Sequence, residues 1–210
     1  MIGNHSINVG AVILAAGSSS RMGTPKQVLQ FEGSSLLKRV TLAALGARCR
    51  PVVVVTGAHA ELCRRELEGF DVHEAFNASW ETGMASSVRT GIECLVNLEA
   101  NIAGTALLLC DQPHVTSDII STLAATHHAT GKPIIASAYA GTFGVPALFS
   151  RTLFAQLTQL EGTSGAKEII KRHASDAHFV SFPECETDVD TPDDFDALRS
   201  AGRVEPLVSW

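Results

Sequence analysis

Four consecutive valines, Val52 to Val55, constrain the fold of this 210-residue chain more than any other segment. A strand with one solvated face alternates apolar and polar residues, whereas this run is apolar on both faces. Such a strand is typical of a parallel sheet that is covered on both sides. The valines therefore favour an α/β fold built around a buried parallel sheet.

The rest of the chain alternates apolar, β-branched runs with helical patterns at the spacing of βα units. Strands are predicted over 9–14, 51–56, 71–75, 105–110, 133–138, 146–149 and 178–182, and helices over 36–45, 58–67, 84–98, 117–129, 151–160, 165–173 and 191–199. No repeat or linker interrupts this order. We expect one sheet-centred domain over residues 9–200, with a flexible N-terminus (1–8) and a C-terminal tail (201–210).

Composition excludes several classes of protein. Hydrophobic residues make up 45% of the chain and charged residues 18%, which indicates a packed globule. The net charge of −6 and the pI of about 5.7 argue against a nucleic-acid binder. The longest apolar stretch, 9–16, is too short to cross a bilayer, and no export signal is recognisable, so we expect a cytoplasmic protein without a membrane partner.

The five cysteines are scattered, and no two of them have the spacing of a zinc or redox motif. We expect them to be reduced and mostly buried, since a free cysteine behaves as a small hydrophobic residue. They are Cys49, Cys63, Cys94, Cys110 and Cys185.

Charge is distributed unevenly along the chain. Before Glu32 the only charged side chains are Arg21 and Lys26, whereas residues 184–196 contain seven acids and no lysine or arginine. The acidic stretch is either a solvated loop and helix start, or the cation-holding counterpart of an anion-holding N-terminal loop.

A Gly/Ser-rich loop follows the first predicted strand directly. It reads Leu-Ala-Ala-Gly-Ser-Ser-Ser-Arg-Met-Gly over residues 14–23, followed by Pro25 and Lys26. Small residues let a backbone approach a ligand closely, and successive N–H groups can point at phosphate oxygens. The spacing is neither that of a Walker A loop nor that of the dinucleotide fingerprint.

Two acidic positions and one helix start complete the candidate motifs. Asp111 follows a buried strand, at the edge where α/β sheets place their ligands. Asp190 precedes a helix that Thr191 would cap and Pro192 would begin. Residues 81–91 are rich in small and hydroxyl residues, and capping of the helix from residue 84 by Thr82 or Ser86 would explain them without a ligand.

In this order the motifs resemble those of nucleotidyltransferases with a three-layer, Rossmann-like (GT-A-like) fold and a mixed, mostly parallel central sheet. Within that group the chain most resembles the molybdenum cofactor cytidylyltransferases of the MobA-like NTP transferase family. The resemblance implies that Arg21 and Lys26 stabilise a triphosphate and that, with Asp111, they are catalytic. It also implies that five loop residues wrap the nucleotide: Leu14, Ala15, Ala16, Gly17 and Ser18.

The same resemblance implies a base pocket and a metal site. Gly83, Ser86 and Ser87 would line the base pocket, while Met84 and Val88 are expected in the core. Asp111 and Asp190 would bind Mg²⁺, with Asp188 as a less certain ligand. Magnesium prefers a few carboxylates together with phosphate oxygens and water.

Acceptor binding is assigned to residues around a Gly-x-Pro-x-x-Phe segment, 144–149, which resembles a strand beside the acceptor pocket in this family. The assigned residues are Gln112, Gly144, Pro146 and Lys167. The chain departs from the family nearby: Thr163 stands where relatives have an acid, and Lys167 stands where they have arginine. Lysine keeps the charge but loses the bidentate fork that binds phosphate.

The reaction implied is transfer of CMP from CTP to the phosphate of a molybdopterin-type cofactor, with release of pyrophosphate and Mg²⁺ as cofactor. A molybdoenzyme could receive the product. Three alternatives stay open: a methylerythritol-phosphate cytidylyltransferase, which shares Pro-Lys-Gln at 25–27; a molybdenum cofactor guanylyltransferase, which has Gly-Gly at the position of Ala16 and Gly17; and a non-catalytic nucleotide-binding accessory of a molybdoenzyme.

Overall fold

The computed structural model describes residues 8–201, so the expectations for residues 1–7 and 202–210 fall outside it. The strands are β1 (Val9–Leu14), β2 (Gln30–Phe31), β3 (Ser34–Ser35), β4 (Val52–Thr56), β5 (His73–Phe76), β6 (Gly104–Leu109), β7 (Ile134–Tyr139), β8 (Thr142–Ser150) and β9 (Ala177–Ser181). The α-helices are α1 (Leu36–Gly46), α2 (Ala60–Leu67), α3 (Met84–Leu98), α4 (Ser117–Thr130), α5 (Phe154–Thr158), α6 (Ala166–Arg172) and α7 (Pro192–Ala201).

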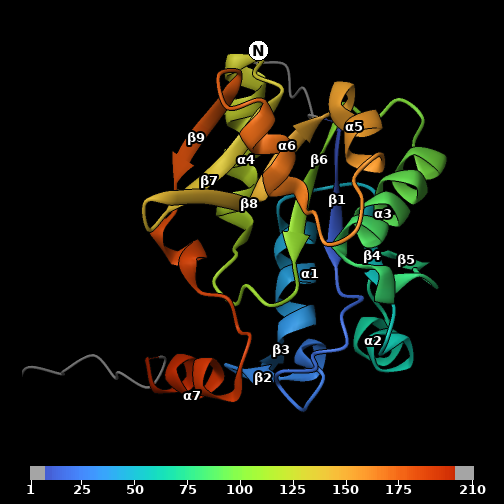
Figure 1. Ribbon diagram of the computed structural model, residues 1–210, viewed down its shortest axis with the longest axis vertical. Helices are drawn as coiled ribbons and strands as arrows, with labels where there is room; N and C mark the ends of the chain where they lie inside the picture. The colour runs from blue at the N-terminus through green and yellow to red at the C-terminus, as the bar shows by residue number, and fades with distance from the viewer. Residues whose placement is uncertain (1–7, 202–210) are drawn as a thin grey trace, which may run out of the picture.

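A seven-stranded sheet forms the centre of the molecule, in the order β5-β4-β1-β6-β8-β7-β9 (Figure 1). Every neighbouring pair is parallel except the two that β8 makes, with β6 and with β7. Strands β2 and β3 form a separate small hairpin. The sheet is therefore mixed and mostly parallel, as the sequence predicts.

Helices cover both faces of this sheet, because its inner strands are apolar on both faces. Along β1, Ala11 and Ile13 pack towards α1, α2 and α4. Their neighbours Val12 and Leu14 pack towards α3, α5 and α6. The valines of β4 divide between the two cores in the same way, and all four are fully buried. The buried parallel strand expected from the valine run and the three-layer α/β fold implied by the resemblance are both confirmed.

Local signals explain the start of α1 and both ends of α4. The Ser35 side chain accepts a hydrogen bond from the backbone N–H of Lys38 and begins α1. Thr116 caps α4, which ends at Gly131 in a left-handed conformation. Two predicted boundaries are wrong: the strand predicted over 146–149 extends over all of β8, and the helix predicted over 151–160 is a 3₁₀ turn (Arg151–Leu153) followed by the shorter α5.

All five cysteines are free thiols, and four of them are buried, while Cys94 is partly buried. Burial raises the pKa of Cys49, Cys63 and Cys185 to about 12. These thiols stay protonated at neutral pH, in agreement with the structural role expected for them. None of the helices between residues 8 and 201 combines the length and the apolar character that a membrane crossing requires.

Candidate active site

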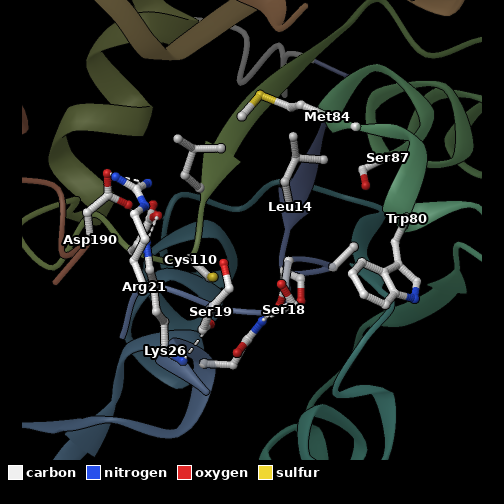
Figure 2. A pocket seen from close by; sticks show the side chains of 18 of the residues that line it. Leu14, Ser18, Ser19, Arg21, Lys26, Trp80, Met84, Ser87, Cys110 and Asp190 are labelled. Atoms are coloured by element: carbon white, nitrogen blue, oxygen red, sulfur yellow. Dashed lines mark hydrogen bonds and ion pairs between the residues drawn. The ribbon is translucent and has the colours of Figure 1, made fainter. Parts of the chain in front are cut away.

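The carboxyl ends of β1 and β6 meet at one edge of the sheet, since the two strands are parallel neighbours with Leu14 opposite Leu109. The Gly/Ser-rich loop leaves β1 here, and Asp111 follows β6. A cavity of about 400 Å³ opens between them (Figure 2). Its lining residues are Leu14, Ala15, Ala16, Gly17, Ser18, Ser19, Ser20, Arg21, Lys26, Gln27, Trp80, Glu81, Gly83, Met84, Ser87, Leu109, Cys110, Asp111 and Asp190.

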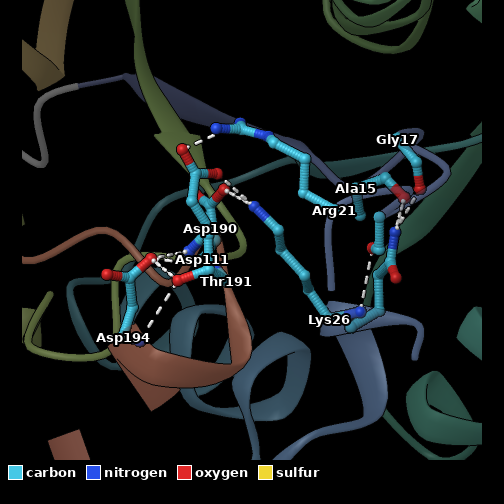
Figure 3. Close-up of polar contacts among 10 residues, drawn as sticks. Ala15, Gly17, Arg21, Lys26, Asp111, Asp190, Thr191 and Asp194 are labelled. Carbon is cyan, nitrogen blue, oxygen red and sulfur yellow. Dashed lines mark hydrogen bonds and ion pairs between the residues drawn. The ribbon is translucent and has the colours of Figure 1, made fainter. Parts of the chain in front are cut away.

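Two cations and two carboxylates form a cluster at one end of this cavity (Figure 3). Lys26 Nζ donates to Asp111 Oδ2 at 3.2 Å and also to Asp190 Oδ1. Arg21 Nη2 donates to Asp190 Oδ2 at 2.8 Å. The cluster thus joins the positive N-terminal loop to the acidic C-terminal segment, a proximity that the second interpretation of the charge pattern requires.

Backbone contacts hold Asp190 in this cluster. The N–H of Val189 donates to the carbonyl of Asp111 at 3.0 Å, and the Val189 side chain is fully buried beside α7. Asp194 Oδ2 accepts from the backbone N–H of Asp190 and of Thr191, at 3.1 and 2.7 Å. The N–H of Asp194 donates back to the Thr191 hydroxyl, so a capping box begins α7 as Thr191 and Pro192 predict.

The electrostatics of the cluster favour a charged lysine. Burial lowers the pKa of Lys26, but its bonds to Asp190 and Asp111 outweigh that effect and the pKa is raised overall. Burial raises the pKa of Asp111 despite the lysine. Burial also opposes ionisation of Asp190, but Lys26 and Arg21 prevail and its pKa is lowered. At neutral pH the cluster holds a lysine ammonium against the Asp190 carboxylate.

The carboxylates fit a divalent cation that takes its other ligands from a substrate. Asp111 Oδ1 is buried and has no hydrogen-bond partner among the described residues. Within residues 8–201, no three His, Cys, Asp or Glu side chains are grouped as a ready-made metal site. A protein site of this kind suits Mg²⁺, which is commonly held by one or two carboxylates plus phosphate oxygens and water.

The side chain of Gln27 holds the Gly/Ser-rich loop in place. It is almost fully buried, and its Nε2 donates to the carbonyls of Ala15 and Gly17, both at 2.9 Å (Figure 3). Each of these carbonyls would otherwise lack a partner inside the fold, which is unfavourable. In the sequence Gln27 stands out only as part of the Pro-Lys-Gln motif, which does not predict this contact.

Replacing Gln27 by alanine is expected to lower the free energy of unfolding by about 1–3 kcal/mol, because two loop carbonyls lose their donor. Urea denaturation of the purified variant measures the change. Gln30→Ala is the matched control: Gln30 is exposed, and its Nε2 bonds only to the Val28 carbonyl, at 3.2 Å. The control is expected to stay within about 0.5 kcal/mol of the parent. Equal losses in the two variants would contradict the role of Gln27.

Figure 2 shows Trp80 and Ser87 on the side of the cavity opposite Arg21, Lys26 and Asp190. Glu81 and Gly83 also line the cavity. Ser86 is not among the lining residues. Its hydroxyl accepts from Asn77 Nδ2 at 2.8 Å and bonds to the carbonyl of Gly83.

Two expectations about the start of α3 are wrong, and one is confirmed. No side chain caps the helix, so neither Thr82 nor Ser86 has that role. Met84 is not in the core: 44% of the residue is exposed, it lines the cavity, and it packs against Gly165. Val88 is fully buried, as expected.

The residues assigned to acceptor binding lie around β8, outside the cavity wall. Gln112 is buried and donates to the carbonyl of Val145 at 3.1 Å. Pro146 accepts from the buried Ser137 hydroxyl, and Tyr139 packs over Gly144. The structure brings these three to one region of the sheet.

Lys167, the fourth residue assigned to acceptor binding, lies on α6. Its Nζ donates to the Thr142 hydroxyl at 2.9 Å and lies 5.9 Å from the centroid of the Phe143 ring. It therefore lies near the start of β8, and the cavity wall does not include it.

Part of the cavity wall consists of residues that the sequence motifs do not predict. The lining residues without an assigned role are Ser19, Ser20, Gln27, Trp80, Glu81, Met84, Leu109 and Cys110. Each of them lies within three positions of an assigned residue, so proximity along the chain is the one signal that points to them.

Comparison with known proteins identifies close relatives. The family model described as MobA-like NTP transferase domain matches residues 11–177. "Purine catabolism protein PucB" of Bacillus subtilis (strain 168) is 31% identical over 203 residues, which cover 90% of this chain and 95% of that protein. "Molybdenum cofactor cytidylyltransferase" of Escherichia coli (strain K12) is 25% identical and covers 89% of this chain and 93% of its own length.

The chain is also similar to a solved structure. The crystal structure of Rv0371c from Mycobacterium tuberculosis H37Rv superposes with a TM-score of 0.77 at 29% identity, over 91% of this chain and 98% of that one. A further structure of that protein is a complex with manganese; it has a TM-score of 0.75 at 27% identity and covers 92% of this chain and 98% of its own.

Proposed function

The chain belongs to the MobA-like NTP transferase domain family, and on this premise we propose that it transfers CMP from CTP to the phosphate of a molybdopterin-type cofactor, releasing pyrophosphate. Nucleotidyl transfer is the chemistry of the family, while the nucleotide and the acceptor are the proposed parts. One observation carries the proposal: a cluster of charged side chains lines the same cavity as the Gly/Ser-rich loop, whose backbone N–H groups can bind phosphate oxygens. The cluster consists of Arg21, Lys26, Asp111 and Asp190.

In this reaction an oxygen of the acceptor phosphate attacks the α-phosphorus of the nucleotide. The bond from that phosphorus to the bridging oxygen breaks, and the electron pair leaves with pyrophosphate. The protein is asked for positioning and for neutralisation of negative charge. We assign the charge neutralisation to Lys26 and Arg21, which would exchange their carboxylate partners for phosphate oxygens.

Asp111 and Asp190 would hold a divalent cation, for which we propose Mg²⁺. The unpartnered oxygen of Asp111 and the manganese complex of Rv0371c support this assignment. When bound, such a cation polarises phosphate oxygens and neutralises their charge.

Two features support CTP and a molybdopterin-type acceptor over the alternatives. The loop carries Ala16 before Gly17 where the guanylyltransferase branch typically has two glycines. A relative that covers nearly the whole chain is named a molybdenum cofactor cytidylyltransferase. The acceptor would enter beside β8, where Gln112, Gly144 and Pro146 gather, with Lys167 near the start of the strand.

A pyrophosphate-release assay tests the proposal. The purified chain is incubated with Mg²⁺, molybdopterin and each of CTP, GTP, ATP and UTP in turn, and release is expected only with CTP and acceptor together. Release confined to GTP would make the protein a guanylyltransferase, and release with methylerythritol phosphate as acceptor would make it a cytidylyltransferase of that substrate. A rise in melting temperature with a nucleotide but no release would indicate a non-catalytic accessory, because ligands of the native state stabilise it by mass action.

A further inference from the structure

We propose that His59 is a positioning residue for the triphosphate-binding loop: its ring holds the carbonyl of Ser18 so that the loop keeps its backbone N–H groups for an anion. His59 immediately precedes α2, in the turn after β4. Its Nε2 lies 3.0 Å from the Ser18 oxygen. A carbonyl oxygen only accepts, so Nε2 carries the proton and donates.

The four consecutive carbonyls from Ala15 to Ser18 are all occupied. Those of Ala15 and Gly17 accept from Gln27 Nε2. The alternate carbonyls bond to the β4–α2 turn: that of Ala16 accepts from the N–H of Ala58 at 3.1 Å, and that of Ser18 accepts from His59. Consecutive peptide groups are therefore held from two separate segments, by a buried side chain and by a turn.

The N–H groups of the same loop show the opposite pattern. From Ala16 to Arg21, no backbone N–H donates to an acceptor among the residues that the structure describes. All six of these residues line the cavity. From Ala16 to Ser19 the carbonyls are used while the N–H groups are free, a pattern that matches an anion. A run of free N–H groups is a known way to bind phosphate oxygens.

His59 differs from Gln27 and Ala58, the other two residues that donate hydrogen bonds to these loop carbonyls. Gln27 is buried beneath the loop, and Ala58 contributes only its backbone. The β4–α2 turn lies close to the loop: a Cβ added to Gly57 would be 2.6 Å from the carbonyl oxygen of Ala16. His59 is the side chain of this turn that reaches the exposed half of the loop, so it can be changed without emptying the core.

The inference rests on the proposed function only for the triphosphate, so it is tested with a probe that has neither base nor acceptor. Binding of inorganic tripolyphosphate to the full chain, with Mg²⁺ in excess, is measured by calorimetry. His59→Ala is expected to weaken binding about tenfold, the loss of one hydrogen bond. His59→Gln places an amide N–H near the position of Nε2 and is expected to restore binding to within about threefold of the parent.

The matched control is His127→Ala. His127 also bonds a loop carbonyl through its ring, Nδ1 to the Lys132 oxygen at 2.8 Å, but it lies on α4 and does not line the cavity. The control is expected to bind tripolyphosphate like the parent, while the two alanine variants show similar small changes in melting temperature. A structural role alone would move the melting temperature of His59→Ala without this selective loss and its rescue by glutamine.

Failure of the inference and failure of the proposed function give different results. Parent-like binding by His59→Ala, absence of rescue by glutamine, or absence of tripolyphosphate binding to the parent would each overturn the inference. If binding depends on His59 but no nucleotide yields pyrophosphate, the role of His59 stands and the proposed transferase function fails.

Discussion

Replacing Lys26 by methionine is expected to lower kcat/KM for nucleotidyl transfer by about 10²–10³, the usual effect of removing one preorganised donor from a developing charge. Methionine keeps most of the apolar stem and removes the ammonium that bonds to both Asp111 and Asp190. Initial rates of pyrophosphate release over a range of nucleotide concentrations provide the measurement. Circular dichroism during thermal melting separates lost chemistry from lost folding.

The control for Lys26→Met is the same change at Lys132. That lysine pairs with Asp176 at 4.0 Å, its side chain is 41% exposed, and it does not line the cavity, so its replacement removes an ion pair and leaves the cavity unchanged. Exposed pairs contribute about 0–1 kcal/mol to stability, and Lys132→Met is expected to turn over like the parent. Comparable activities for the two variants would rule out Lys26 as a catalytic residue.

Substituting alanine for Gly83 is expected to lower the free energy of unfolding by about 2–4 kcal/mol. Gly83 has φ +115° and ψ 178°, a conformation that only glycine adopts without strain of about 1–3 kcal/mol. A Cβ there would overlap the carbonyl group of Gly162, 2.6 Å from its carbon, and backbone atoms cannot rotate aside. Chemical denaturation of the variant reports the loss.

The variant Gly131→Ala separates backbone strain from overlap with a neighbouring carbonyl as causes of the loss. Gly131 also has a positive φ, +65°, but a Cβ on it would meet nothing within 4 Å. Its replacement is expected to cost about 1–2 kcal/mol, the penalty of the left-handed conformation alone. If the free energy of unfolding fell by the same amount in both variants, the close contact between Gly83 and Gly162 would not contribute to the cost of Gly83→Ala.

Long periodic elements of this fold can be predicted from the sequence, and short ones cannot. The bounds of β1 and α3 agree with the prediction at both ends, because each has a buried, regular pattern and a clear boundary. The β2–β3 hairpin was missed, since two residues per strand carry no periodicity. Glu32 and Gly33 in its turn both have positive φ. Such turns favour Asn-Gly or Asp-Gly, so Glu-Gly is a weak signal for a hairpin.

The residues that line the cavity also divide into those that the sequence predicts and those that it does not. Residues of the Gly/Ser-rich loop follow a strand directly, so the strand fixes where they lie. Trp80 reaches the cavity from a 3₁₀ turn (Trp80–Thr82), and its place depends on the close approach of Gly57, 23 positions earlier in the chain. Met84 looked like a core residue because the apolar pattern of α3 includes it, yet it occupies the first position, where the helix opens onto the cavity.

The bond between Lys26 and Asp190 closes a loop of 164 residues, and that between Arg21 and Asp190 one of 169. All seven strands of the central sheet end by Ser181, so the sheet can be complete before Asp190 and α7 take their places. Contacts of such sequence separation form late, because closing long loops has an entropic cost that earlier structure must offset. A chain still emerging from the ribosome can therefore have a complete central sheet while its charge cluster still lacks Asp190. Capacity for catalysis would then report that the last helix has docked, and not merely that the core has formed.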